Sequence, residues 1–323
     1  MAWRLRLAPE KTNIDFFRWQ WLTFGGSWLL MVGAVLAWVV MGLSFGIDFE
    51  GGTSIRTEST VAVDVSAYRA ALAGVGLGDV AVTEVFDPSF AADQHVVQVR
   101  IAAAEGTEAV TPEMINAVRG ALQTIDPEIA FTAVESVGPK VSAELIWSAI
   151  MAMLGAGAAV LIYIWLRFEW QYAVGAVLAL FHDIIITIGI FALFQLKFDL
   201  TIVAALLTIL GYSINDTVVV FDRLRENLRK YKTMPLRDVM NLSVNETLSR
   251  TLATSLTTLV ALVAMLIFGG DVIRGFVLAI IIGIILGTYS SVFVAKNLVL
   301  FLGLDRSDKP KKADTNEFAN IDA

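Results

Sequence analysis

A single ionisable side chain lies within a long apolar stretch of this chain. Residues 200–221 read LTIVAALLTILGYSINDTVVVF, and Asp216 is the only charged residue among them. A stretch of this length is sufficient for a helix to cross the ~30 Å hydrocarbon core of a membrane. A charge inside a membrane is costly unless it is neutralised or paired, so acids in such spans are rare and usually functional. Asp216 is therefore the first candidate for a proton- or ion-binding residue.

A base that could pair with Asp216 opens the next apolar stretch. Arg250 begins RTLATSLTTL, and Thr254 follows on the same helical face, where further threonines continue a polar stripe. We predict a proton relay made of Asp216, Arg250 and Thr254, with Tyr212 and Ser213 close enough along the helix to hydrogen-bond Asp216. Burial favours a neutral carboxyl group and a nearby arginine favours a charged one, so this group could titrate near neutral pH. The alternative is an arginine that extends to the membrane surface, beside threonines bonded to their own helix backbone.

A second polar pair lies in LALFHDIIITIG, where His182 and Asp183 fall near the middle of a predicted span. The pair could extend the relay or bind a partner subunit. A metal site is not expected, because consecutive helix positions point apart and the chain has only 2 histidines.

Composition places these residues in a polytopic α-helical membrane protein. The chain has 323 residues, 56% of them hydrophobic, and a mean hydropathy of +0.68, which is too apolar for an ordinary soluble domain. It has no cysteine, which excludes disulfides and zinc–thiolate sites. We predict a bundle within residues 141–303 and an additional first span. The six predicted spans cover residues 22–44, 146–166, 172–194, 200–221, 251–268 and 275–295.

The charge pattern predicts the orientation of these spans. Basic residues concentrate in residues 1–21, in the connection 223–249 and in the polar tail 304–323, and such segments usually stay in the cytoplasm. Both termini are therefore expected to be cytoplasmic, with the first span acting as an uncleaved signal anchor. The large insertion 45–140 then lies outside. It is acidic, which argues against nucleic acid as a partner.

The insertion 45–140 is predicted to fold as a periplasmic α+β domain between the first two spans. Alternating residues predict strands at 53–58, 80–86, 95–101 and 129–135. Helices are predicted after the N-caps Asp64 and Thr111, the second with Pro112 at its first position. The order βαββαβ is that of a ferredoxin-like fold.

The glycines indicate packing and turns rather than phosphate binding. Gly283 and Gly287 form a GxxxG pair, and Gly155 and Gly157 are similar small positions for close helix contact. The glycines of FGIDFEGGT favour a turn before a strand, because neither a P-loop lysine nor a dinucleotide fingerprint follows. No cofactor is implied, and no nucleophile–base–metal arrangement indicates an enzyme. Any work that the protein does is expected to draw on an ion gradient or a partner.

Six motifs, in consistent order from about residue 45 to 300, resemble the SecF family of bacterial protein-export membrane proteins. They are FGIDFEGGT, SVGPKVSAEL, FHDIIITIG, LTIVAALLTILGYSINDTVVVFDRLREN, LSRTLATSLTTL and IFGGDVIRGF. The resemblance implies half of a transporter-like unit of the resistance-nodulation-division (RND) superfamily in the inner membrane, with SecD as the other half. It further implies association with the SecYEG channel, YajC and a translocating preprotein, and use of the proton-motive force. Family proton-path residues correspond to Asp216, Arg250 and Thr254, and the His182–Asp183 pair also resembles a family feature.

Two alternatives remain open at this point. The chain could be a non-transporting assembly subunit that stabilises the translocon, with structural buried charges. It could also be an exporter of small molecules or lipids from the same superfamily, although such exporters usually have twelve spans and larger outer domains. In the coupled cycle, Asp216 would take up a proton, lose its ion pair with Arg250 and allow the helices to shift. Sodium coupling and the number of protons in each cycle are not determined by the sequence.

Overall fold

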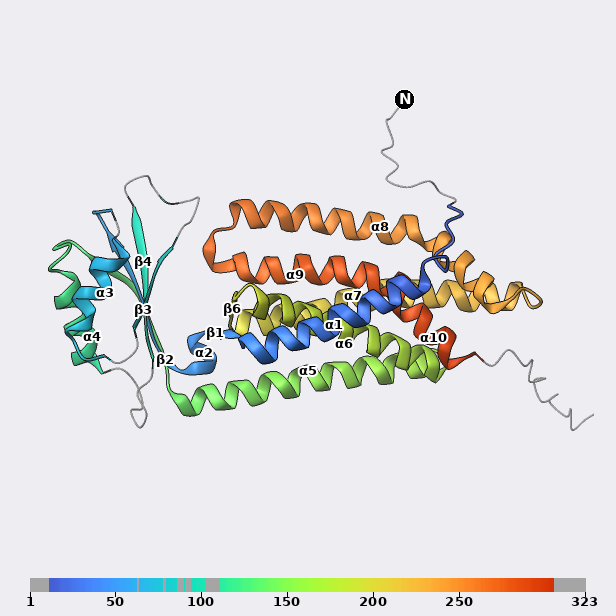
Figure 1. Ribbon diagram of the computed structural model, residues 1–323, viewed down its shortest axis with the longest axis horizontal. Coiled ribbons are helices and arrows are strands. Elements are labelled where there is room, and N and C mark those ends of the chain that lie inside the picture. The colour runs from blue at the N-terminus through green and yellow to red at the C-terminus, as the bar shows by residue number, and fades with distance from the viewer. Residues whose placement is uncertain are drawn as a thin grey trace, which may run out of the picture.

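The computed structural model describes residues 12–62, 64–77, 80–85, 90, 94–102 and 111–304. The start of the predicted N-terminal segment, the last residue of the strand predicted at 80–86 and nearly all of the polar tail fall outside these ranges. Six long helices form a bundle, and a small sheet domain stands at one end of it (Figure 1). This confirms the predicted fold class. The long helices are α1 (Gln20–Met41), α5 (Pro139–Arg167), α6 (Trp170–Leu193), α7 (Leu200–Lys230), α8 (Leu236–Phe268) and α9 (Asp271–Ser290), which continues through a π-helical turn η1 (Ser291–Ala295) into α10 (Lys296–Leu302).

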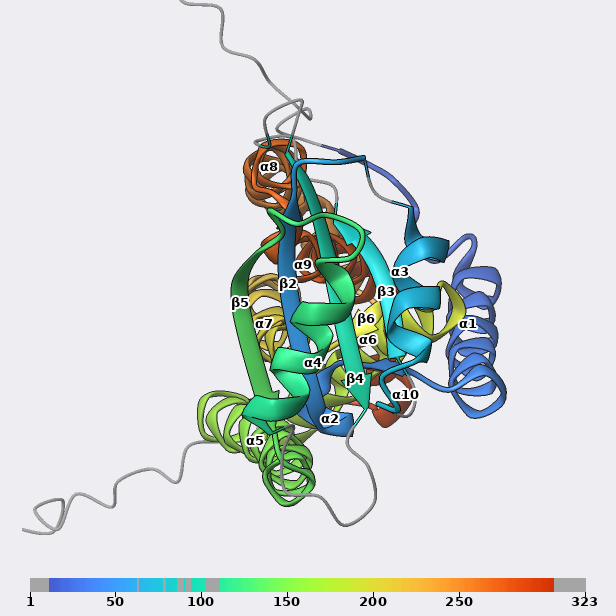
Figure 2. The same ribbon diagram turned by 90° about the vertical axis from the view of Figure 1, so that its left-hand side faces the viewer.

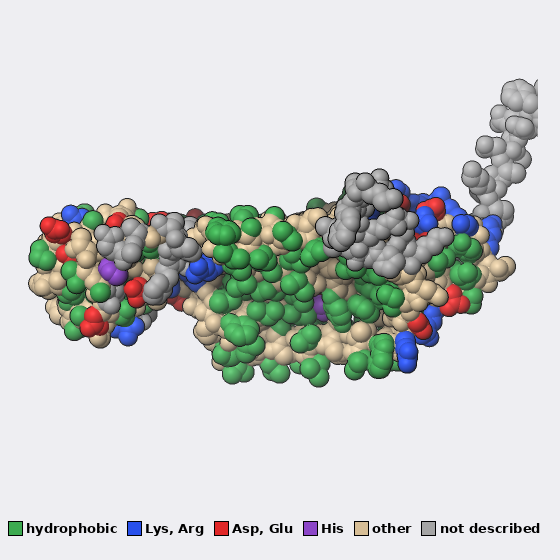
Figure 3. Space-filling model, turned by 90° about the horizontal axis from the view of Figure 1, so that it is seen from above, with side chains coloured by type: hydrophobic (Ala, Val, Ile, Leu, Met, Phe, Trp, Pro, Cys, Tyr) green, Lys and Arg blue, Asp and Glu red, His purple; other side chains and the backbone are tan. Residues whose placement is uncertain are grey.

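On the face shown in Figure 3, an apolar belt covers the bundle between two ends that carry charged side chains. Helices α7 and α8 continue beyond this belt. The residues DRLRENLRK, which end the apolar run of α7, are good helix formers, and α8 begins directly after Pro235. The helices therefore extend further than hydropathy indicates, and their polar ends pack on each other outside the belt.

The sheet domain has the predicted βαββαβ order. It contains β2 (Gly52–Ser59), α3 (Val65–Ala73), β3 (Val80–Val85), β4 (His95–Ala102), α4 (Pro112–Leu122) and β5 (Ala130–Val137). The four strands pair antiparallel in the order β3-β4-β2-β5, and both helices cover one face (Figure 2). Asp64 and Thr111 accept the backbone N–H bonds that the predicted N-caps require.

A short joint connects the sheet domain to the start of α7. Strand β1 (Ser44–Phe45) pairs parallel with β6 (Lys197–Phe198), and α2 (Ile47–Glu50) leads into β2. The carboxylate of Asp48 accepts the backbone N–H of Leu200 at 3.0 Å. From the sheet, Arg100 donates to the carbonyl of Phe45 at 2.7 Å. The FGIDFEGGT motif therefore forms the turn expected from its glycines and also ties two parts of the chain together.

Close packing of α7 on α9 depends on two of the predicted small positions. A Cβ at Gly283 would lie 2.3 Å from the Ile209 side chain, and one at Gly287 would lie 2.9 Å from Ser213. Gly155 differs from the prediction, because a Cβ there would meet no atom within 4 Å. Its helix α5 packs loosely at the edge of the bundle, where small side chains are not required.

Candidate functional site

Two carboxylates are buried inside the bundle, on neighbouring helices. Asp183 comes from α6 and is 0% exposed, and Asp216 comes from α7 and is 3% exposed. Helices α8 and α9 supply hydroxyl groups to them. Both aspartates belong to the sequence-predicted set, but their surroundings differ from each other and from the prediction.

Asp183 is held by three side chains from three helices. Its Oδ1 lies 3.0 Å from Nδ1 of His182. Its Oδ2 accepts hydrogen bonds from Ser213 of α7 at 2.8 Å and from Ser290 of α9 at 2.7 Å. Breaking these bonds would leave buried polar groups unsatisfied, so this cluster holds α6, α7 and α9 together.

This cluster corrects two sequence-based expectations. Consecutive residues of a helix point in different directions, yet the side chains of His182 and Asp183 turn far enough to meet. Ser213 was expected to bond Asp216, one turn further along α7, but it donates to Asp183 across the helix interface. Tyr212 also faces elsewhere, because its hydroxyl donates to the carbonyl of Thr254 at 3.1 Å.

Asp216 has a much weaker hydrogen-bond environment. Within the described residues, its carboxylate is bonded by one side chain, Ser255 of α8, over a long 3.4 Å. Ser255 also shares a 2.7 Å hydrogen bond with Thr288 of α9. The Thr288 hydroxyl in turn bonds the carbonyl of Ile284 in its own helix. A short row of hydroxyl groups therefore runs from Asp216 through α8 to α9.

The predicted relay partners lie apart from this row. Among the described residues, no hydrogen bond or ion pair joins Asp216 to Arg250, whose side chain is exposed, although the charge of Arg250 still acts on Asp216 through space. Thr254 donates to the carbonyls of Arg250 and Thr251 in its own helix. In this conformation the threonines bond their own backbone, as the alternative interpretation described. The relay of Asp216, Arg250 and Thr254 stays a prediction.

Three hydroxyl residues were missed as aspartate partners: Ser213 was assigned to the wrong carboxylate, and Ser255 and Ser290 were not singled out, nor was Thr288, which bonds Ser255. For Ser290 there was a signal: a small polar residue in an otherwise apolar span, one helical turn from a glycine. Ser290 follows Gly287 at that spacing and immediately precedes the π-helical turn η1. Such turns insert an extra residue into a helix and are frequent at functional sites.

His182 has a second ring nitrogen that faces away from Asp183. Its Nε2 has no hydrogen-bond partner among the described residues. The ring borders an apolar cavity of about 220 Å³ between α1, α6 and the segment formed by η1 and α10, lined also by Phe24, Trp28 and Phe181. Over the described part of the chain, no group of three or more His, Cys, Asp or Glu side chains could hold a metal.

Comparison with known families places this arrangement among protein-export proteins. Residues 117–305 match the family described as protein export membrane protein SecD/SecF, C-terminal. Residues 36–63 match the SecD/SecF GG motif, which contains the joint between the sheet domain and α7. Together the two matches cover β1 and α2, the beginning and the end of the sheet domain, and the helices from α5 to α10.

Individual relatives agree with this placement. The chain is 68% identical to protein translocase subunit SecF of Cereibacter sphaeroides over 100% of both chains. It is 41% identical to SecF of Calditerrivibrio nitroreducens over 94% of this chain and 98% of that one. Among solved structures it is similar to SecDF, a translocon-associated membrane protein from Thermus thermophilus, with a TM-score of 0.81 and 34% identity over 92% of this chain. The matched region is 39% of the SecDF chain.

Proposed function

The chain belongs to the SecF group of the SecD/SecF family of protein export membrane proteins, and we propose that it couples proton movement at Asp216 to the export of proteins across the bacterial inner membrane. As a protein translocase subunit it is a transport protein rather than an enzyme. We further propose that the proton-motive force is the energy source and that SecD is a partner.

The observation that carries this proposal is the environment of Asp216. Its carboxylate is nearly fully buried, yet its one recorded hydrogen bond is long. A proton carrier must gain and lose a proton without disrupting the helices around it, and a carboxyl group with few bonds meets that requirement. The hydroxyl row of Ser255 and Thr288 offers further exchangeable protons beside it.

The partners follow from the relatives and the motif resemblance. A chain that matches 39% of SecDF is expected to assemble with a SecD subunit that supplies the rest. SecYEG, YajC and a translocating preprotein are the further partners we propose. The sheet domain would face the periplasm and both termini the cytoplasm, in agreement with the basic residues at the ends of α7 and the start of α8.

A coupled cycle requires at least two conformations. A second structure, SecDF in the super-membrane-facing form, matches this chain with the same 34% identity but a TM-score of 0.67 instead of 0.81. The part of SecDF that matches this chain therefore differs in arrangement between the two structures. Two arrangements of the matched part are what a coupled cycle requires, and we propose that the change between them accompanies a change in the protonation of Asp216.

The test compares Asp216→Asn with wild type in inverted vesicles that contain SecD, SecYEG and this chain. The measured quantity is the release of an exported precursor with and without a pH gradient. We expect the variant to lose the gradient-dependent increase while keeping its complex with SecD. The matched control is Asp222→Asn, the same change on the same helix at an exposed carboxylate, which should release precursor as wild type does.

Other outcomes favour other functions. Gradient-dependent release that survives in Asp216→Asn, at equal protein level, would favour the assembly subunit. A gradient-driven accumulation of a small or lipid substrate without SecYEG would favour the exporter. Replacing the pH gradient by a sodium gradient identifies the coupling ion.

A further inference from the structure

The residues that precede α1 lie against the start of α8 through their backbone. Asn245 accepts the N–H of Ile14 at 2.8 Å and donates to the Ile14 carbonyl at 2.8 Å. One turn earlier on α8, Asn241 donates to the same carbonyl at 3.0 Å and accepts the N–H of Phe16 at 2.9 Å. The Ile14 side chain itself is exposed. Two asparagines therefore hold this segment, residues 12–18, through its backbone N–H and carbonyl groups and not through its side chains.

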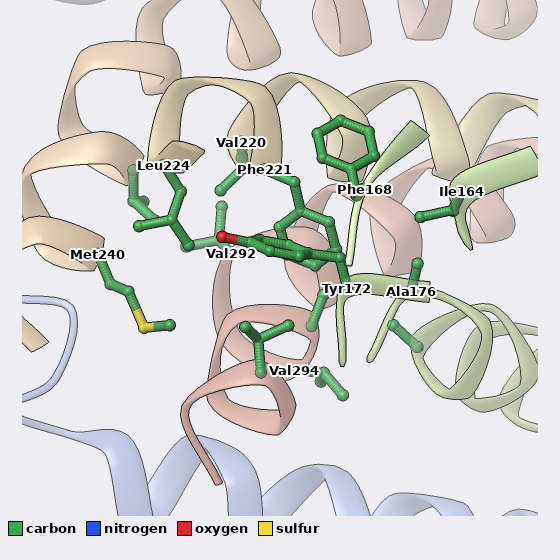
Figure 4. Packing of buried hydrophobic residues seen from close by; sticks show 14 of the residues in the cluster. Ile164, Phe168, Tyr172, Ala176, Val220, Phe221, Leu224, Met240, Val292 and Val294 are labelled. Carbon is green, nitrogen blue, oxygen red and sulfur yellow. The ribbon is translucent and has the colours of Figure 1, made fainter. Parts of the chain in front are cut away.

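Two phenylalanines anchor the same segment in the bundle. Phe16 and Phe17 are buried and belong to the apolar cluster drawn in Figure 4, between α6, α7, α8 and η1. Lys296, which is 1% exposed, places its Nζ 3.5 Å from the centre of the Phe17 ring. The Arg237 guanidinium lies 5.1 Å from the same ring and donates to the Phe17 carbonyl. Both basic side chains thus pack on the Phe17 ring and help to hold this segment in place.

The start of α8 is also held by hydrogen bonds and an ion pair from α7. Arg223 donates to Glu246 at 2.6 Å, and Asn227 donates to Ser243 and Glu246 at 3.1 and 2.7 Å. The other end of α8 lies at the edge of the bundle with large apolar side chains exposed, among them Val260, Ile267 and Phe268 (Figure 1). The position of α8 is therefore set mainly by its first half.

We propose that Asn241 and Asn245 are positioning residues for the Asp216 site. By holding residues 12–18 they fix the first half of α8, and so set the distance from Ser255 to Asp216. Ser255 lies ten residues after Asn245 on the same unbroken helix, a rise of about 15 Å. The hydrogen bond that it makes to Asp216 is already 3.4 Å long, so a small displacement of α8 breaks it. Because residues 12–18 run directly into α1, which packs on α6, they also link α8 to a helix on another side of the bundle.

The absence of cysteine from the sequence allows a direct test that needs no transport. Ser255→Cys places the only thiol of the chain at a site that is 4% exposed, and its labelling by a membrane-permeant maleimide is measured in lipid nanodiscs. Trypsin cleavage after the exposed Arg18 reports separately whether residues 12–18 are released. We expect both rates to rise by about tenfold or more in Asn241→Ala/Asn245→Ala, because the double variant loses all four hydrogen bonds that hold Ile14 and Phe16.

A matched pair of changes at Ile14 separates backbone from side-chain effects. Ile14→Pro removes the N–H that Asn245 accepts, one of the four hydrogen bonds, and should raise both rates, although less than the asparagine variant does. It replaces the asparagine variant in the test if that variant does not accumulate. Ile14→Ala keeps the N–H and should behave as wild type. Faster cleavage without faster labelling at position 255 would show that the segment is held but does not position α8, and would overturn the proposal. Unchanged cleavage, or an Ile14→Ala variant as labile as Ile14→Pro, would overturn the role of the asparagines. None of these outcomes depends on proton coupling, so they are independent of the export experiment.

Discussion

The surroundings of Asp183 and of Asp216 differ although the two residues lie on neighbouring helices at the centre of the bundle. Asp183 is bonded by His182, Ser213 and Ser290, with all three distances at or below 3.0 Å. Asp216 is bonded by Ser255 alone, at 3.4 Å, within the described residues. Both are buried, so burial does not distinguish them. They differ in the number and the length of their hydrogen bonds.

This difference assigns them different roles. A carboxylate with three short bonds from three helices fixes those helices in one arrangement, and any change of its charge disturbs all of them. A carboxylate with one long bond loses little when its proton or its neighbours move. We therefore expect Asp183 to be needed for the fold of the bundle and Asp216 for its activity.

The largest expected effect is on folding, at Asp183. Asp183→Ala leaves His182 Nδ1 and the Ser213 hydroxyl without the partner recorded for them and leaves Ser290 only a 3.3 Å bond to the Gly287 carbonyl, and each unsatisfied buried group costs about 1–3 kcal/mol. We expect strong thermal destabilisation or loss of the protein from membranes, with a smaller loss for Asp183→Asn. Asp216→Asn should unfold close to the wild-type temperature. The measurement is heat unfolding in detergent followed by tryptophan fluorescence. Equal destabilisation by Asp183→Asn and Asp216→Asn would remove the distinction.

A smaller effect is expected from widening the contact that places Ser213 beside Asp183. Gly287→Ala puts a methyl group 2.9 Å from the Cβ and Oγ of Ser213, so α7 and α9 must separate or Ser213 must move. Overpacking of this kind costs about 1–3 kcal/mol. The matched control is Gly155→Ala, where the new Cβ meets nothing within 4 Å and the helix gains about 0.5–1 kcal/mol. Heat unfolding measures both, and a Gly287→Ala variant as stable as Gly155→Ala would contradict the tight contact.

The fold was accessible from the sequence to a greater extent than the site was. Apolar runs and strand alternation are local properties, so six spans and the βαββαβ order could be predicted without knowledge of packing. The spatial order of the strands in the sheet, β3-β4-β2-β5, comes from the structure. Helix ends were less predictable. The polar end of α7 is helical up to Lys230, although hydropathy identifies only the apolar part of a helix.

Side-chain partners depend on how the helices are rotated and packed. The spacing along α7 placed Ser213 on the same face as Asp216, but the close approach of Gly287 turns Ser213 to Asp183. Helix α8 is rotated so that Ser255 points inward and Arg250 is exposed. No local pattern in the sequence of α8 determines this rotation. The backbone contacts of Asn241 and Asn245 leave no sequence signal, because they recognise groups common to all residues.

A third carboxylate, Asp126, tests whether the number of hydrogen bonds or the location inside the membrane makes Asp183 more important for stability than Asp216. Asp126 lies in the sheet domain and accepts hydrogen bonds from the Ser59 hydroxyl at 2.7 Å and from the backbone N–H groups of Thr60 and Glu128, both at 2.9 Å. The Ser59 hydroxyl is the main cause that holds the pKa of Asp126 below its ordinary value of 3.8, followed by the N–H of Glu128, with partial burial opposing them. By bond number Asp126 resembles Asp183, but water can reach this domain.

The expected effect at Asp126 is therefore the smallest and depends on pH. Because the folded pKa is lowered, the charged form stabilises the domain above the ordinary pKa, and this stabilisation is lost as pH falls through the folded value. Asp126→Asn should weaken the protection of β2 amides against hydrogen exchange at neutral pH, and its difference from wild type should shrink below about pH 4. Exchange rates corrected for the intrinsic effect of pH measure this in the full chain. A loss of stability as large as that caused by Asp183→Asn would mean that the number of hydrogen bonds alone decides how strongly a carboxylate stabilises its surroundings, whether or not water is near. A loss of protection independent of pH would contradict the role of the charge of Asp126.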